Sequence, residues 1–139
     1  MNTWNISDEA AALHRDALIW DMTTVWKHSV PTDRKLELLS RAVDSGYDLI
    51  SLALSSEWDG REDPLPMLAQ ERALLEEHAD KFVLFDSAED VIEAKREGKL
   101  AVCFHFKSCP SRIDVAEVED YYRLGVHHCI FFNLGAVEG

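Results

Sequence analysis

The stretch that decides the fold runs from Gly98 to Pro110 and reads G-K-L-A-V-C-F-H-F-K-S-C-P. Its apolar run, residues 100–106, has no helical spacing and is too short for a typical helix, so it predicts a buried parallel strand. Side chains alternate across a strand. One face would therefore carry small and then polar residues, ending at His105 and Lys107, while the other would be bulky throughout. That asymmetry is typical of a barrel strand lying under outer helices.

The same pattern of a glycine followed by a strand recurs along the chain, before residues 47–50 and 126–130, so one unit is repeated. Strands are predicted at 17–22, 48–55, 82–85, 100–106 and 128–133. Helices are predicted between them and before the first, at 8–16, 33–45, 67–80, 88–97 and 114–124. Alternating strands and helices predict right-handed βαβ units and a parallel sheet.

Two architectures fit this α/β pattern: a partial (β/α)8 barrel with five strands, or an open doubly wound sheet. A full barrel needs about 250 residues, so five strands are a little over half of one. The partial barrel is the preferred interpretation. Residues 1–139 are expected to form a single domain, because neither an interdomain linker nor a low-complexity segment interrupts them.

The composition narrows the classes of partner. Fourteen basic against 26 acidic residues give a net charge of −12, and such a surface repels phosphate backbones, so a nucleic-acid partner is not expected. No apolar run reaches about 18 residues, so no membrane span is expected. The three cysteines are odd in number and the N-terminus lacks the layout of a signal peptide. These features predict reduced thiols and a cytoplasmic protein.

Polar residues at predicted strand ends are the candidates for a metal site, namely Asp21, His105 and Lys107. Zinc accepts imidazole and carboxylate ligands, and an open coordination position would activate water for amide hydrolysis. Lys107 could join such a site if its amine were carboxylated. The plainer interpretation is a hydrogen-bonded aspartate, a core histidine and a solvated or ion-paired lysine. Thr23, Trp26 and Trp58 are the predicted lining of a substrate pocket.

Other motifs carry less chemistry. Ser108 and Cys109 follow the central strand, but no G-x-S-x-G sequence surrounds them, so no catalytic nucleophile is assigned. The glycines do not form a G-x-G-x-x-G loop, so a nucleotide cofactor is not expected. His127 and His128 are predicted to begin the last strand, at the end of a barrel where residues usually serve stability.

Several stretches resemble the renal (membrane) dipeptidase family, zinc peptidases with an amidohydrolase-like barrel. They read H-R-D-A-L-I-W-D-M-T, D-S-G-Y-D-L-I-S-L, F-V-L-F-D-S-A-E-D-V-I-E-A-K-R-E-G-K-L-A-V and Y-Y-R-L-G-V, and the likeness runs from about His14 to the C-terminus. It would cover only the N-terminal half of a family member. The resemblance implies a dipeptidase-like metallohydrolase that cleaves a dipeptide or related small amide with zinc.

The chain departs from the motif of that family at the ligand positions. Thr23 and Val25 stand where the family would place its His-x-Asp pair, and Lys107 stands where it would place a bridging glutamate. These substitutions point to an incomplete or degenerate enzyme. The alternative is a non-catalytic barrel that binds a small ligand or a partner. A third possibility is a half-barrel that forms a homodimer to cover its sheet edges.

Overall fold

The computed structural model describes residues 6–25, 29–55, 64–107 and 114–130. Within these ranges five strands form one sheet in which each ladder is parallel: β1 (Trp20–Thr24), β2 (Leu49–Ser55), β3 (Phe82–Leu84), β4 (Leu100–Phe106) and β5 (Val126–Cys129). The strand order is β1-β2-β4-β3, and β5 also pairs with β4. The α/β class and the parallel sheet predicted from the sequence are confirmed.

The helices alternate with the strands as predicted. They are α1 (Asp8–Asp16), α2 (Thr32–Asp44), α3 (Leu65–Glu77), α4 (Ala88–Glu97) and α5 (Val118–Arg123), the last preceded by a 3-10 turn at Val115–Glu117. Local chemistry fixes their ends. The Ser87 hydroxyl accepts from the Asp90 N–H in a capping box that starts α4, and Gly98 ends it in a left-handed conformation with φ of 69°. None of the described helices is long and apolar enough to cross a bilayer.

Two predicted strands are displaced in the structure. The first strand begins at Trp20 rather than at Ala17, and the last spans Val126–Cys129 rather than residues 128–133. The last strand starts early because the ladder with β4 already pairs Val126 with Phe104. The error matters for function, because it moves His128 from the start of a strand toward its carboxyl end.

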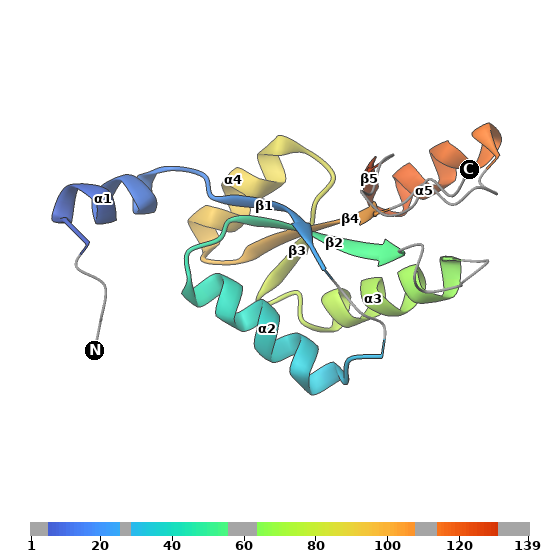
Figure 1. The fold of residues 1–139 in the computed structure, drawn as a ribbon, viewed down its shortest axis with the longest axis horizontal. Coiled ribbons are helices and arrows are strands. Elements are labelled where there is room, and N and C mark those ends of the chain that lie inside the picture. The colour runs from blue at the N-terminus through green and yellow to red at the C-terminus, as the bar shows by residue number, and fades with distance from the viewer. Residues whose placement is uncertain (1–5, 26–28, 56–63, 108–113, 131–139) are drawn as a thin grey trace, which may run out of the picture.

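Strand β4 is the centre of the sheet and every one of its seven residues is buried. Its bulky face, which includes Phe104, lies in the larger core together with Leu39 of α2 and Leu68 of α3. The other face carries Ala101 and Cys103 and packs against α4 through two of its apolar residues, Val91 and Ala94. Helices thus cover both faces, as Figure 1 shows with α2 and α3 on one side of the sheet and α4 on the other.

The handedness of the connections explains the position of α4. After β2 the chain forms β3 beyond the position of β4, and it then returns through α4 to form β4 between β2 and β3. Because this connection runs back along the sheet, a right-handed crossover places α4 on the face opposite α2 and α3. Without this excursion through β3 and α4 the order is β1-β2-β4-β5, which is the sequential order of a barrel. Helix α4 covers the amino-terminal part of the second face and leaves its carboxyl-terminal part to polar side chains.

The sheet is strongly curved. His128 of β5 places its Nε2 3.0 Å from the carbonyl oxygen of Met22 in β1, although β4 and β2 lie between these strands. In a flat sheet the two backbones would be about 14 Å apart. This curvature and the sequential order of β1-β2-β4-β5 are consistent with a partial (β/α)8 barrel. Helices on both faces also occur in doubly wound sheets, but a flat open sheet would not allow this contact.

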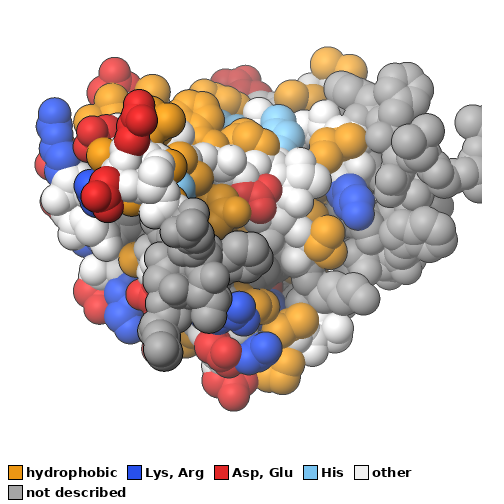
Figure 2. Space-filling model, turned by 60° about the vertical axis from the view of Figure 1, so that its left-hand side comes forward, with side chains coloured by type: hydrophobic (Ala, Val, Ile, Leu, Met, Phe, Trp, Pro, Cys, Tyr) orange, Lys and Arg blue, Asp and Glu red, His pale blue; other side chains and the backbone are white. Residues whose placement is uncertain are grey.

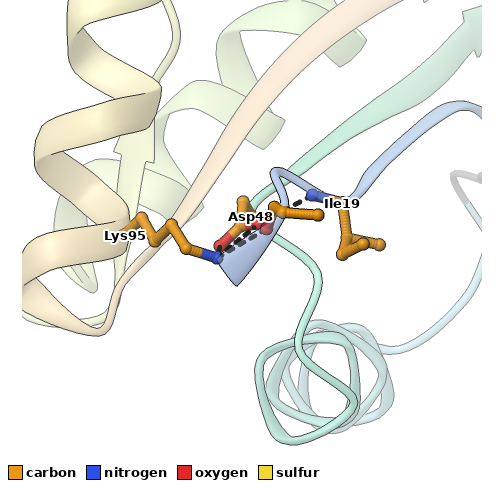
Figure 3. A network of polar contacts seen from close by, with 4 residues as sticks. Ile19, Asp48 and Lys95 are labelled. Atoms are coloured by element: carbon orange, nitrogen blue, oxygen red, sulfur yellow. Dashed lines mark hydrogen bonds and ion pairs between the residues drawn. The ribbon is translucent and has the colours of Figure 1, made fainter. Parts of the chain in front are cut away.

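A polar network joins the amino-terminal ends of the strands. The Asp48 carboxylate, at the entrance to β2, accepts from the Ile19 N–H at 2.7 Å and from Lys95 Nζ of α4 at 2.9 and 3.0 Å (Figure 3). Lys95 also donates to the Ala17 carbonyl oxygen at 2.9 Å. The network fixes α4 and the segment before β1 to the start of β2.

Candidate functional site

Polar side chains from β2, β4 and β5 meet on the face of the sheet that also packs against α4. His105 and His128 lie near the carboxyl-terminal ends of β4 and β5, whereas Ser51 is the third residue of β2. Ser51 Oγ and His105 Nδ1 are 2.9 Å apart, and both residues are fully buried. The His105 ring stacks on the ring of His128 with centroids 4.6 Å apart and planes 13° from parallel. We call Ser51, His105 and His128 the histidine cluster. Its last member reaches the Met22 carbonyl oxygen, so the cluster connects all four barrel-ordered strands.

The hydrogen bonds determine which ring nitrogens carry protons. A carbonyl oxygen only accepts, so His128 donates from Nε2 to Met22, and its Nδ1 has a lone pair whenever the ring is uncharged. Ser51 Oγ lies 2.9 Å from His105 Nδ1 and can accept a hydrogen bond from it when Nδ1 carries the proton. In this arrangement His105 Nε2 also keeps a lone pair. His105 Nε2 and His128 Nδ1 are the two buried side-chain polar atoms without a hydrogen-bond partner in the described part of the chain.

The surroundings keep His105 neutral. Burial lowers its pKa to about 4, the nearby charges of His128 and Lys107 act in the same direction, and the charge of Asp21 acts against them. A neutral imidazole at pH 7 can accept a proton or bind a cation, but it cannot act as a proton donor of the imidazolium type. Burial also raises the pKa of the Cys103 thiol, so that cysteine is a poor nucleophile.

The predicted metal ligands lie at this end of the sheet, but they do not all share a face. Lys107 follows the end of β4, is half-buried, and has no hydrogen bond or ion pair with the residues that the structure describes. Asp21 is paired with Ile50, whose side chain belongs to the core under α2 and α3, so it lies on the face opposite His105. The sequence predicts both as candidate ligands of one site. The metal-binding role of these three residues stays a prediction.

The cavity beside Asp21 differs from the predicted pocket. It has a volume of about 330 Å³ and lies between β1 and α2, where Asp21, Thr24 and Leu39 help to line it. The Thr23 side chain is exposed. The backbone N–H of Thr23 donates to the Asp21 carboxylate at 2.9 Å, and this hydrogen bond shapes the end of β1. Trp26 and Trp58, the other predicted pocket residues, lie outside the described residues.

His128 is the member of the cluster that the sequence analysis missed. Its predicted position at the beginning of a strand placed it at the stabilising end of the barrel, whereas β5 begins two residues earlier and sets His128 opposite His105. Its neighbour His127 packs edge-on against Phe85 and Tyr122, with Nε2 2.8 Å from the Phe85 carbonyl oxygen. Alternation along the strand therefore separates the two histidines.

A complete zinc site is not present among the residues described. A catalytic zinc ion has three protein ligands, and no group of three or more His, Cys, Asp or Glu side chains that could hold a metal occurs in those ranges. The histidine cluster offers two nitrogen donors. We therefore derive no catalytic step through a metal ion.

Comparisons with known proteins bear on the fold. No protein-family model matches the chain, and no curated protein matches its sequence. Among solved structures, an amidohydrolase from Pseudomonas aeruginosa aligns with a TM-score of 0.73 at 21% identity over 91% of this chain and 38% of its own. The probable dipeptidase PvdM from Pseudomonas aeruginosa aligns with a TM-score of 0.62 at 18% identity, over 91% of this chain and 37% of its own. The chain thus spans less than half the length of either protein and shares their fold.

Proposed function

We propose that this chain forms part of a dipeptidase-like hydrolase that acts on a dipeptide or a related small amide. The observation that carries the proposal is the buried histidine cluster near the carboxyl-terminal ends of parallel strands, which is where barrel enzymes place their active sites. The structural likeness to an amidohydrolase and to a probable dipeptidase supports the same class of reaction.

The side chains in this region can bind such a substrate. The Lys107 ammonium group, which has no partner among the described residues, would attract the carboxylate of a dipeptide. His105 would remain neutral beside it, because burial holds its pKa low, and the same low pKa makes it a weak base. Zinc is the cofactor that this class implies, and Asp21, His105 and Lys107 are the ligands predicted from the sequence. Because Asp21 lies on the face opposite His105, and no group of three metal-binding side chains occurs among the described residues, no step is assigned to the metal.

The first experiment measures the metal content of the folded chain and its hydrolysis of a panel of dipeptides after addition of zinc. We expect hydrolysis that Lys107→Gln reduces at least tenfold, because the change removes the ammonium group that attracts the substrate carboxylate. Lys99→Gln is the matched control, since Lys99 pairs with Glu97 on the surface at 2.8 Å. Bound zinc without dipeptide hydrolysis would argue against this function.

The second candidate is a non-catalytic barrel that binds a small ligand or a partner. It is favoured by the residues at the motif positions, since Thr23, Val25 and Lys107 replace the ligands expected of the family. Under this alternative, equilibrium dialysis would find an amino acid or dipeptide bound to the chain and recovered unchanged.

For partners and location we propose a homodimer in the cytoplasm. Strand β1 lies at the edge of the sheet and exposes 50% of Trp20 and 40% of Met22, which a second copy could cover. Figure 2 shows further hydrophobic side chains between charged ones on the face that it displays. The buried Cys103 thiol, which forms no disulfide, suits a reducing compartment. A native mass equal to one chain would contradict the dimer.

A further inference from the structure

Each ring of the histidine cluster has one buried nitrogen without a hydrogen-bond partner in the described part of the chain. We propose that His105 Nε2 and His128 Nδ1 together bind one first-row transition metal ion such as Cu²⁺. His128 is not among the ligands predicted from the sequence, and the motif positions of the resembled family take no part in the site. The inference does not require the chain to hydrolyse anything.

Each ring of the histidine cluster is held through one nitrogen by an oxygen atom. A histidine that ligates a metal nearly always donates its other ring N–H to an oxygen, which fixes the tautomer and aims the free lone pair. His128 donates to the Met22 carbonyl oxygen at 3.0 Å, and His105 is bonded through Nδ1 to Ser51 Oγ at 2.9 Å. Both rings therefore already have the outer contacts of metal-binding imidazoles.

Leaving the other two nitrogens buried without partners costs free energy. His105 is fully buried, and neither His105 Nε2 nor His128 Nδ1 is accessible to solvent or hydrogen-bonded. A buried polar atom without a partner is unfavourable and is uncommon in folded proteins. Two such atoms on rings in contact indicate that a bound species completes the site. Imidazole suits Cu²⁺, Zn²⁺ and Ni²⁺.

The stack also defines what must move when an ion binds. Rings that are 13° from parallel, with centroids 4.6 Å apart, do not aim both lone pairs at one point. Binding therefore requires the two rings to rotate apart while His105 Nδ1 stays near Ser51 and His128 Nε2 stays near Met22. His128 is half-buried and has more room to move than the fully buried His105. Because two nitrogens fill only part of a coordination sphere, water or a ligand oxygen would occupy the remaining positions.

His127 provides a matched control on the same strand. Its Nε2 also contacts a carbonyl oxygen, that of Phe85 at 2.8 Å, but its ring packs between Phe85 and Tyr122 and is not stacked on another histidine. His127→Gln and His128→Gln each replace one histidine of β5 with glutamine. Only the loss of His128 removes a proposed ligand.

The test is titration of the purified full chain with Cu²⁺, read by calorimetry and by electron paramagnetic resonance. We expect one ion per chain, coupling to two imidazole nitrogens, and at least tenfold weaker binding in His128→Gln but not in His127→Gln. Equal binding by wild type and His128→Gln, coupling to a single nitrogen, or no binding would overturn the proposal.

Two features keep the experiment decisive. The spectrum of the wild-type protein counts the coordinating nitrogens without any variant, so failure of His128→Gln to fold does not remove the test. Metal binding at the histidine cluster without dipeptide hydrolysis would refute the proposed function and leave this inference standing. Hydrolysis by a chain whose metal affinity is unchanged in His128→Gln would do the reverse.

Discussion

Polar side chains gather at both ends of the sheet, but the hydrogen bonding of the two groups differs. At the amino-terminal end, the Asp48 carboxylate receives hydrogen bonds from Lys95 and from the Ile19 N–H. At the carboxyl-terminal end, the paired rings of His105 and His128 each keep one buried nitrogen without a partner. Both arrangements connect segments distant in sequence, but only the first is complete in itself.

This difference separates a structural network from a candidate site. A buried charge that is paired and hydrogen-bonded serves the fold, and removing one partner leaves the other desolvated and alone. An incomplete polar cluster has a nitrogen without a partner, to which a proton, a metal ion or a ligand can bind. The comparison predicts that changes at the amino-terminal end alter stability alone, whereas changes at the carboxyl-terminal end also alter binding and pH response.

The largest effect is expected for Asp48→Ala. The change leaves Lys95 and the Ile19 N–H without their acceptor, and breaking a buried ion pair in this way costs about 3–5 kcal/mol. Because the Lys95 side chain is 29% exposed, we expect a loss of about 3 kcal/mol in the free energy of unfolding, measured by urea denaturation. Copper binding of the folded fraction should not change.

The control for this change is the exposed pair of Glu93 and Arg96 on α4, whose atoms are 3.5 Å apart. Glu93→Ala should alter the free energy of unfolding by no more than about 0.5 kcal/mol, because water screens such pairs. If Asp48→Ala were as mild as Glu93→Ala, the amino-terminal network would not hold the fold.

The next effect is a loss of stability in acid that originates at His105. Its pKa is lowered to about 4 in the folded chain, against an ordinary value near 6.5 when unfolded. Above pH 6.5 both states are neutral. Between pH 6.5 and 4 the unfolded chain binds a proton that the folded chain does not, so stability falls as pH falls, by about 2 to 3 kcal/mol across the window.

Two measurements check this titration. Urea denaturation at several pH values should give a slope that is reduced in His105→Gln, and NMR titration of the imidazole protons should place the His105 midpoint well below those of exposed histidines. A His105 midpoint near 6.5 would show that the cluster is open to water, and it would remove the contrast between the two ends of the sheet.

Local signals in the sequence predicted the fold well. The seven residues of β4 match the predicted strand one for one, because a short apolar run without helical spacing has few other interpretations. The limits of α4 follow from a serine cap and a glycine, whose conformational preferences are local. Strand order was harder to predict: the sequence does not show that the chain passes over β4 to form β3.

The candidate site was predicted only in part, because its members depend on strand register. His105 was identified from its place in β4, but pairing it with His128 required the start of β5 to be known to within two residues. Asp21 was predicted as a ligand of the same site, but its pairing with Ile50 places it on the face opposite His105. Such features are set by tertiary pairing, and a single residue's shift exchanges the faces of a strand.

The smallest effect on stability is expected for Ser51→Ala, the change that best distinguishes the two ends of the sheet. It removes the partner of His105 Nδ1, which should lower the free energy of unfolding by about 1 to 2 kcal/mol. It keeps both proposed metal ligands but releases the His105 ring, and loss of such an outer contact weakens metal binding about 10- to 100-fold. Ser45→Ala, at the exposed end of α2, is the control and should change neither property. A Ser51→Ala protein with lower stability but unchanged copper affinity would assign Ser51 to the fold alone, as Asp48 is at the other end.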